Sequence, residues 1–281
     1  MVKKESSNMG ILYIVSTPVG NLEDITLRAI EILKNVDVIA AEDTRHTLKL
    51  LNRLEISKPL ISYHRHNEEV RKDLLIEKLN SGENIALVSD AGTPGISDPG
   101  MEVIKEAINN NIEVIAIPGA TAFVPALVCS GLNTNEFTFL GFLPLNKKLR
   151  KIKLEEIRVS NKTVIVYEAP HKLKQTLKDF EEILGDRKVC IAREITKIHE
   201  EYVRGTVKEL INKFDEVKGE IVILIEENNN IVVENIFDNM TIEEHYAFYE
   251  QKGYDKKEII KKVSKDRNLS KNDVYIKFIK K

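Results

Sequence analysis

The sequence predicts two consecutive α/β domains followed by a small helical module. Short apolar runs of strand length alternate with longer stretches whose apolar residues recur at helical spacing. Such alternation favours parallel strands with helices on the faces of a sheet. The series is interrupted near residues 131–136, and three short amphipathic segments without intervening strands end the chain. The 281 residues are enough for two packed domains and an appendage.

The first α/β domain is expected over residues 10–131. Its strands are predicted at 11–15, 37–41, 60–63, 85–89 and 112–117. Helices are predicted around the stripe Ile25, Ala29, Ile32 and Leu33, with Asp24 as N-cap, and at 70–79 and 101–109. This spacing of strands and helices predicts a parallel sheet.

The second α/β domain is expected over residues 132–228. Its strands are predicted at 137–142, 163–167, 188–192, 202–204 and 220–225. Helices are predicted at 148–158, 172–184 and 207–214. Its last two strands are close in sequence with a single helix between them, which predicts a mixed sheet.

Residues 236–281 are expected to form a basic helical module. Amphipathic segments cover 242–252, 256–266 and 271–279, and Ser270 is placed to cap the last one. Residues 251–281 hold eleven Lys or Arg against four acids, although the whole chain carries only −2. The short turn between the last two segments indicates a helix-turn-helix whose basic residues contact phosphates. A plain three-helix packing appendage is the alternative.

Composition excludes several classes of protein. No apolar run approaches the roughly 18 residues that span a bilayer, and MVKKESSNM lacks the apolar region of a secretory signal. Cys129 and Cys190 are expected to be buried free thiols, which fits a cytoplasmic location. No His or Cys pair has zinc-ligand spacing, so no metal is expected.

Five unusual segments follow directly after the predicted strands of the first domain. They are STPVGNLEDIT (16–26), AEDTR (41–45), HRHNEE (64–69), SDAGTPGISDPG (89–100) and PGATA (118–122). Ligands of open parallel sheets bind past the carboxyl ends of the strands, and glycine lets main-chain amides approach them. Neither GxxxxGK[ST] nor GxGxxG is present, so the ligand is expected to be neither a triphosphate nor a dinucleotide.

Six ordered motifs resemble the tetrapyrrole methylase superfamily: STPVGNLEDIT, AEDTR, LVSDAGTPGISDPG, IPGATA, VYEAPH and AREITK. Within it, residues 11–225 are similar to the branch that 2′-O-methylates a decoding-region cytidine of small-subunit (16S) ribosomal RNA. That branch also has a basic terminal helix-turn-helix. The resemblance implies S-adenosylmethionine held in a cleft between two α/β domains, a homodimer, and ribosomal RNA or the 30S subunit as partner.

The same resemblance implies which residues bind the cofactor: Val19, Asp90, Thr93, Ile96, Thr121, Ala122, Tyr167, Glu168 and Ala192. Small residues at 91–95 and 119–122 let backbone groups reach the adenosine and amino-acid ends of S-adenosylmethionine. A carboxylate such as Asp90 favours the positively charged sulfonium.

A ribose hydroxyl is a poor acid, so methyl transfer needs a base, or a cation that stabilises the developing alkoxide. The candidates for this role are Asp43, Arg45, His66, Glu194 and Lys197. Their structural alternatives are an ion pair at a strand end for the first two, an exposed loop position for His66, and interdomain salt bridges for the last two.

Two other functions remain open at this point. A methylase of the same superfamily acting on a small molecule such as a tetrapyrrole has no evident need for cationic terminal helices. A non-catalytic ribosome-binding relative would keep the fold without turnover. Transfer of a labelled methyl group to RNA distinguishes all three.

Overall fold

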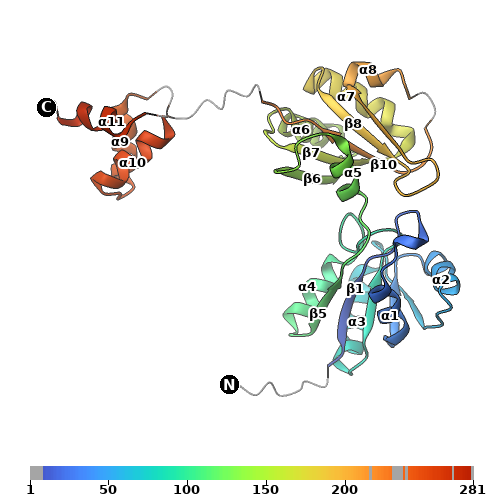
Figure 1. Cartoon of the computed structure of the whole chain (residues 1–281). Helices are drawn as coiled ribbons and strands as arrows, with labels where there is room; N and C mark the ends of the chain where they lie inside the picture. The colour runs from blue at the N-terminus through green and yellow to red at the C-terminus, as the bar shows by residue number, and fades with distance from the viewer. Residues whose placement is uncertain (1–8, 215–216, 230–236, 238–239, 268, 280–281) are drawn as a thin grey trace. The chain divides into compact units, whose positions relative to one another are not determined.

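The computed structural model divides the chain into two compact units, Met1–Asn228 and Asn229–Lys281 (Figure 1). It describes residues 9–214, 217–229, 237, 240–267 and 269–279, and of 277–279 the backbone alone. Unit 1 contains two five-stranded sheets. The predicted domain limits, 10–131, 132–228 and 236–281, stay predictions, and residue 236 lies outside the described residues.

The first sheet is entirely parallel, as predicted, with strand order β3-β2-β4-β1-β5. Its strands are β1 (Ile11–Val15), β2 (Val38–Ala41), β3 (Leu60–Ser62), β4 (Ile85–Val88) and β5 (Glu113–Ile117). The connections contain η1 (Leu22–Asp24), α1 (Leu27–Asn35), α2 (Thr44–Arg53), α3 (Glu68–Asn80) and α4 (Met101–Asn109).

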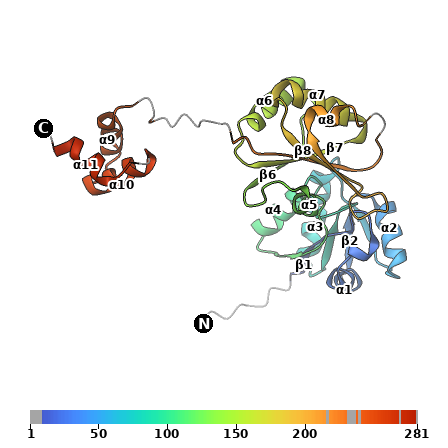
Figure 2. The same ribbon diagram turned by 45° about the horizontal axis from the view of Figure 1, so that its top comes forward.

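The helices cover opposite faces of this sheet (Figures 1 and 2). α1 and α2 bury Ala29, Leu33 and Leu51 against one face, whereas α3 and α4 bury Leu75 and Val103 against the other. The helices that follow the neighbouring strands β1 and β4, α1 and α4, therefore lie on opposite faces of the sheet. A crevice for a ligand forms where such connections part.

The second sheet is mixed, as predicted, with order β6-β7-β10-β8-β9, and only β6 and β7 are parallel. Its strands are β6 (Phe137–Phe142), β7 (Thr163–Glu168), β8 (Lys188–Arg193), β9 (Glu201–Thr206) and β10 (Ile221–Ile225). The helical segments are α6 (Lys147–Arg158), η2 (Pro170–Lys172), α7 (Leu173–Leu184) and α8 (Val207–Ile211). The last strand in sequence, β10, lies at the centre of the sheet and is buried along its whole length.

Two helices were not predicted, one predicted cap is wrong, and Cys129, which was expected to be buried like Cys190, is exposed. α2 follows β2 directly, and α5 (Phe123–Ser130) follows the first sheet but packs on the second through Ala126 and Leu127. With the predicted boundary between residues 131 and 132, α5 belongs to the first domain, although it packs on the sheet of the second. Asp24 does not cap α1, because the Thr26 hydroxyl accepts the hydrogen bond from Ala29 N and Asp24 ends η1.

Unit 2 contains α9 (Ile242–Gln251), α10 (Lys256–Asp266) and α11 (Lys271–Ile279). Their core consists of Ile242, Ile259, Ile260, Val263 and Val274. Ser270 Oγ accepts a hydrogen bond from Asp273 N at 3.1 Å, in agreement with its predicted capping role. Among the described residues, no helix is long and apolar enough to cross a bilayer.

Arg267 connects the parts of unit 2. Its guanidinium donates to the carbonyl oxygens of Phe237, Met240 and Thr241, and to His245 Nδ1 at 3.0 Å. The His245 ring is fully buried and stacks on Phe237 with centroids 3.6 Å apart. Arg267 thus stabilises the module and is not a free cation for a ligand.

Candidate functional site

Three of the segments that follow strands of the first sheet meet, as the sequence predicts. Thr17 after β1 and Gly92 after β4 exchange backbone hydrogen bonds of 2.8 and 3.0 Å. The Thr93 hydroxyl lies 2.8 Å from Ser16 Oγ and donates to Ala120 O, in the loop after β5, at 3.2 Å. Gly92 has φ +82°, a conformation that glycine adopts without strain. The loop after β4 therefore sits between the other two.

A cavity of about 400 Å³, here the first cavity, opens beside these loops. Its lining is drawn from both sheets of unit 1: Val19, Glu42, Asp90, Ala91, Gly92, Thr93, Ile96, Ser97, Asp98, Thr121, Ala122, Phe142, Tyr167, Glu168, Ala169, Pro170, Gly219, Glu220, Ile221 and Val222. Eight of the nine predicted cofactor residues are among them, all except Ala192. Ala192 is fully buried in β8, in the cluster that α5 covers.

Three carboxylates from the loops after β2 and β4, Glu42, Asp90 and Asp98, line the cavity, and they interact. Asp90 Oδ1 accepts from Asp43 N at 3.0 Å, and Asp90 N donates to Glu42 Oε2 at 3.5 Å. Burial, followed by the charges of Glu42 and Asp90, raises the pKa of Asp98 to about 7. Burial and the charge of Asp90 also raise the pKa of Glu42. Such mutual repulsion makes the cavity favourable for a cation.

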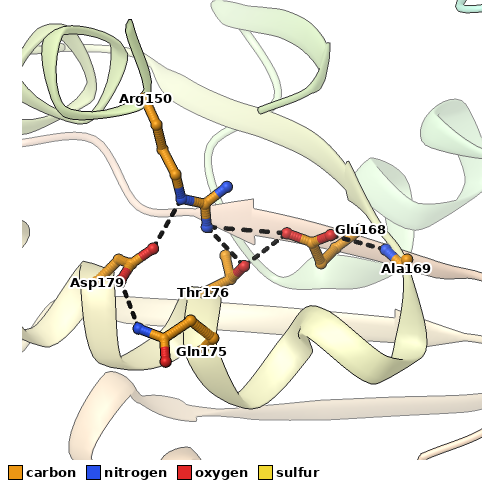
Figure 3. Close-up of polar contacts among 6 residues, drawn as sticks. All are labelled: Arg150, Glu168, Ala169, Gln175, Thr176 and Asp179. Carbon is orange, nitrogen blue, oxygen red and sulfur yellow. Dashed lines mark hydrogen bonds and ion pairs between the residues drawn. The ribbon is translucent and has the colours of Figure 1, made fainter. Parts of the chain in front are cut away.

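Glu168 lines the cavity, but its carboxylate is already engaged by protein groups (Figure 3). One oxygen accepts from Ala169 N at 2.8 Å, and the other accepts from the buried Thr176 hydroxyl at 2.5 Å. Arg150 donates to that hydroxyl at 2.7 Å and forms an ion pair with Asp179 at 2.7 Å. This Glu168 network fixes β7, η2 and α7, and through them the cavity wall at Ala169 and Pro170.

A second cavity of about 610 Å³ adjoins the first, and they share Val19, Asp90, Ala91 and Glu220. Its other lining residues are Thr17, Pro18, Gly20, Leu22, His46, Lys49, Leu50, Arg53 and Lys197. The second cavity is thus rich in cations, whereas the first is rich in carboxylates. Two reactants of opposite charge can meet at the shared wall.

Lys197 is held between two carboxylates. Its Nζ lies 3.0 Å from Glu194 Oε1 and 3.3 Å from Glu220 Oε2. Burial lowers the pKa of Lys197, but the hydrogen bond to Glu194 and the charge of Glu220 outweigh burial, so the pKa is raised overall. The side chain is therefore a stable cation and not a base.

Two glycines make room for this arrangement. A Cβ on Gly20 would lie 2.5 Å from Lys197 Cγ, and a Cβ on Gly219 would lie 2.1 Å from Glu194 Oε1. Glu194 itself has φ +52°, which is unusual for a residue with a side chain. Backbone strain of this kind clusters at functional sites.

The other candidate catalytic residues line neither cavity. Asp43 caps α2 and forms an ion pair with Arg45 at 2.8 Å, and the Arg45 side chain is 87% exposed. Hydrogen bonds from Arg45 hold the pKa of Asp43 far below its usual range. The His66 ring lies 6.0 Å from that of His64, in the loop after β3. The structure thus brings only Lys197 to a cavity, with Glu194 as its partner.

Asp98 and Glu220 line the first cavity but were not predicted from the sequence. Asp98 lies within the glycine-rich segment after β4, so its place in that motif was an available signal. Glu220 precedes β10, and no local pattern places that strand between β7 and β8. Among the described residues, no group of three or more His, Cys, Asp or Glu side chains is arranged to hold a metal ion.

Comparisons with known proteins agree with this architecture. The model of the tetrapyrrole (corrin/porphyrin) methylases matches residues 11–211. Two relatives named ribosomal RNA small subunit methyltransferase I are similar over nearly the whole chain. The one from Bacillus subtilis is 50% identical over 96% of this chain and 94% of its own length, and the one from Halalkalibacterium halodurans is 49% identical over 97% and 96%.

A solved structure of uroporphyrin-III C-methyltransferase from Thermus thermophilus, complexed with S-adenyl homocysteine, shares the fold. Its TM-score is 0.55 at 19% identity, and the match covers 78% of this chain and 98% of that one. The sheets, the strand-end loops and these similarities agree. The chain belongs to the tetrapyrrole methylase family and, within it, to the group of ribosomal RNA small subunit methyltransferases I.

Proposed function

We propose that this chain transfers a methyl group from S-adenosylmethionine to the 2′-hydroxyl of a cytidine ribose in the decoding region of 16S ribosomal RNA. The observation that supports it best is the carboxylate-lined first cavity beside a cation-rich second cavity. Relatives about 50% identical over almost the full chain are named ribosomal RNA small subunit methyltransferase I, and this name supports an RNA substrate.

The first cavity fits the cofactor in size and in charge. Its volume of about 400 Å³ lies within the range of about 300–1,000 Å³ for small-molecule sites. Glu42, Asp90 and Asp98 would face the sulfonium and ammonium groups of the cofactor, while Thr93 and Thr121 offer hydroxyls. S-adenosylmethionine supplies a methyl group on a positively charged sulfur, which is an excellent leaving group.

The chain's own residues then act on the acceptor hydroxyl. Lys197 presents a fixed positive charge in the second cavity and stabilises oxygen as it becomes negative. Asp90 and Glu220 line both cavities, so they lie where the donor and the hydroxyl meet and are the carboxylates able to take its proton. Glu194 acts through Lys197 and is a positioning residue.

The protein is proposed to act in the cytoplasm on ribosomal RNA or the 30S subunit, as a homodimer. Unit 2 would add affinity for RNA. Its exposed lysines include Lys256, Lys257, Lys261 and Lys265, all on α10. Basic side chains on one helix suit a phosphate backbone and add binding that does not depend on sequence.

Purified protein with methyl-labelled S-adenosylmethionine tests the proposal. Small-subunit particles lacking the modification should become labelled in their RNA, in alkali-resistant ribose-methylated dinucleotides. Labelling of uroporphyrinogen instead of RNA would favour a tetrapyrrole enzyme. Cofactor binding without any labelling of RNA would favour a non-catalytic ribosome-binding protein.

A further inference from the structure

One wall of the second cavity carries basic side chains that methyl transfer does not need. His46, Lys49 and Arg53 lie on α2 at spacings of three and four residues, which places them on one face of the helix. Leu50 lies on the same face and lines the cavity with them. We call His46, Lys49 and Arg53 the α2 row.

Two members of the α2 row, Lys49 and Arg53, carry charges that are available to a ligand. Within the described residues, the side chains of Lys49 and Arg53 form neither an ion pair nor a hydrogen bond, and both are exposed. The acids that line the second cavity are Asp90 and Glu220, both at the wall shared with the first cavity. Glu220 is already paired with Lys197. The α2 wall is therefore positive.

We propose that the α2 row binds the phosphodiester backbone of the RNA strand that flanks the methylated ribose. This inference rests on the proposed function and specifies where its substrate lies. At a rise of about 1.5 Å per residue, His46 and Arg53 are about 10 Å apart along the helix, so the row is long enough to contact more than one phosphate of a strand. Pro18, Leu22 and Leu50 add apolar surface for a sugar or base.

The position of α2 fits this assignment. Asp43, which caps the helix, donates its backbone N–H to Asp90, a residue of the shared wall. A strand lying along the α2 row thus runs toward the place where the acceptor hydroxyl meets the cofactor. Binding there would set which ribose of the strand reaches the methyl group.

The test uses the full chain with Lys49→Gln and Arg53→Gln combined, and a control variant with Lys34→Gln and Lys105→Gln. The control positions are exposed on α1 and α4, and line neither cavity. The probe is a single-stranded oligoribonucleotide with the small-subunit decoding-region sequence. Its dissociation constant is measured across a series of salt concentrations, and KM and kcat are measured for methylation of small-subunit particles.

Each phosphate contact on a single strand contributes about 0.7 to the slope of log K against log salt concentration. The α2 variant should therefore lower the magnitude of that slope by about 1.4 and raise KM at least about tenfold, with S-adenosylhomocysteine affinity unchanged. The control should keep the wild-type slope. An α2 variant with wild-type slope and KM would overturn the inference while wild-type activity still supported the proposed function. Absence of wild-type methylation would instead reject the proposed function.

Discussion

Asp98 is a carboxylate whose ionisation changes near neutral pH. Its pKa is raised to about 7 by burial and by the charges of Glu42 and Asp90, so it is protonated below pH 7 and negative above it. The charge of the first cavity therefore becomes more negative as pH rises from 6 to 8. A positively charged cofactor should bind more tightly over the same interval.

S-adenosylmethionine carries the sulfonium charge, and S-adenosylhomocysteine does not, although both have the same titratable amino-acid end. The affinity for S-adenosylmethionine relative to that for S-adenosylhomocysteine should rise by up to about tenfold between pH 6 and 8. This corresponds to ~1.4 kcal/mol of binding free energy. Asp98→Asn should abolish this rise, whereas Asp73→Asn, at an exposed position on α3, should not. Isothermal titration calorimetry at each pH measures the dissociation constants of both ligands. A ratio independent of pH in the wild type would show that Asp98 does not face the sulfonium.

Lys197 is expected to act on the acceptor as a cation. Lys197→Met should lower the single-turnover rate of methyl transfer about 100-fold, the effect of removing one donor from a site that stabilises a developing oxyanion. Lys197→Arg should retain part of the activity because it keeps the charge. Lys218→Met, at an exposed position that lines neither cavity, is the control. Single-turnover methylation of small-subunit particles measures the rate, and an unchanged rate for Lys197→Met would remove Lys197 from the mechanism.

Single residues of the site differed in how well the sequence predicted them. Asp90, Thr93 and Thr121, which the resemblance implied, lie in glycine-rich or small-residue motifs directly after strands, and the position of those motifs independently predicted a ligand site there. Ala192 was expected there by resemblance alone, and the structure buries it within the second sheet. Asp43 satisfies the N-terminus of α2, a role that its sequence neighbours did not reveal because α2 was not predicted.

At the scale of elements, the Glu168 network joins α6, α7 and β7 behind the first cavity (Figure 3). Thr176→Val removes the hydroxyl that donates to Glu168 and leaves a buried carboxylate oxygen without that partner. The free energy of unfolding should fall by about 1–3 kcal/mol. Thr176→Ser keeps the hydroxyl and serves as the control. Urea unfolding followed by circular dichroism measures both, and equal stability of Thr176→Val and wild type would contradict this role.

The two helices that were not predicted, α2 and α5, lack the usual sequence pattern for different reasons. α2 is strongly amphipathic, but it is polar on average and buries only Thr47 and Leu51, so few apolar residues mark it in the sequence. α5 is apolar on nearly all sides and contains Pro125 in its first turn, so it shows no stripe. α2 lines the second cavity, and α5 begins directly after Thr121 and Ala122, which line the first cavity. Ligand contacts at these places compete with the regular pattern of a core helix.

At the scale of the molecule, unit 1 contains both cavities and unit 2 contributes a cluster of exposed lysines. A chain ending at Asn228 should bind S-adenosylhomocysteine within about twofold of the full chain but show a KM for small-subunit particles raised at least about tenfold. Full-length protein with glutamine at positions 256, 257, 261 and 265 should reproduce the rise in KM. Unchanged KM in both proteins would favour the simpler packing role for unit 2.

The arrangement of the two sheets was predictable where local patterns decide it. Strand–helix alternation predicted the parallel first sheet, and the close spacing of the last strands predicted the mixed second sheet. The central place of β10 was not predictable, because β10 pairs with β7 on one side and with β8 on the other, and both strands are distant from it in sequence. No sequence pattern therefore predicted that the first cavity is also lined by Gly219, Glu220, Ile221 and Val222.

Mapping ribose methylation in 16S ribosomal RNA from cells with and without this protein tests the central claim most directly. We predict one decoding-region cytidine that is 2′-O-methylated in cells with the protein, unmodified in its absence, and methylated again when purified protein and S-adenosylmethionine are added to the deficient subunits. Identical methylation maps from both kinds of cell would contradict the proposed activity.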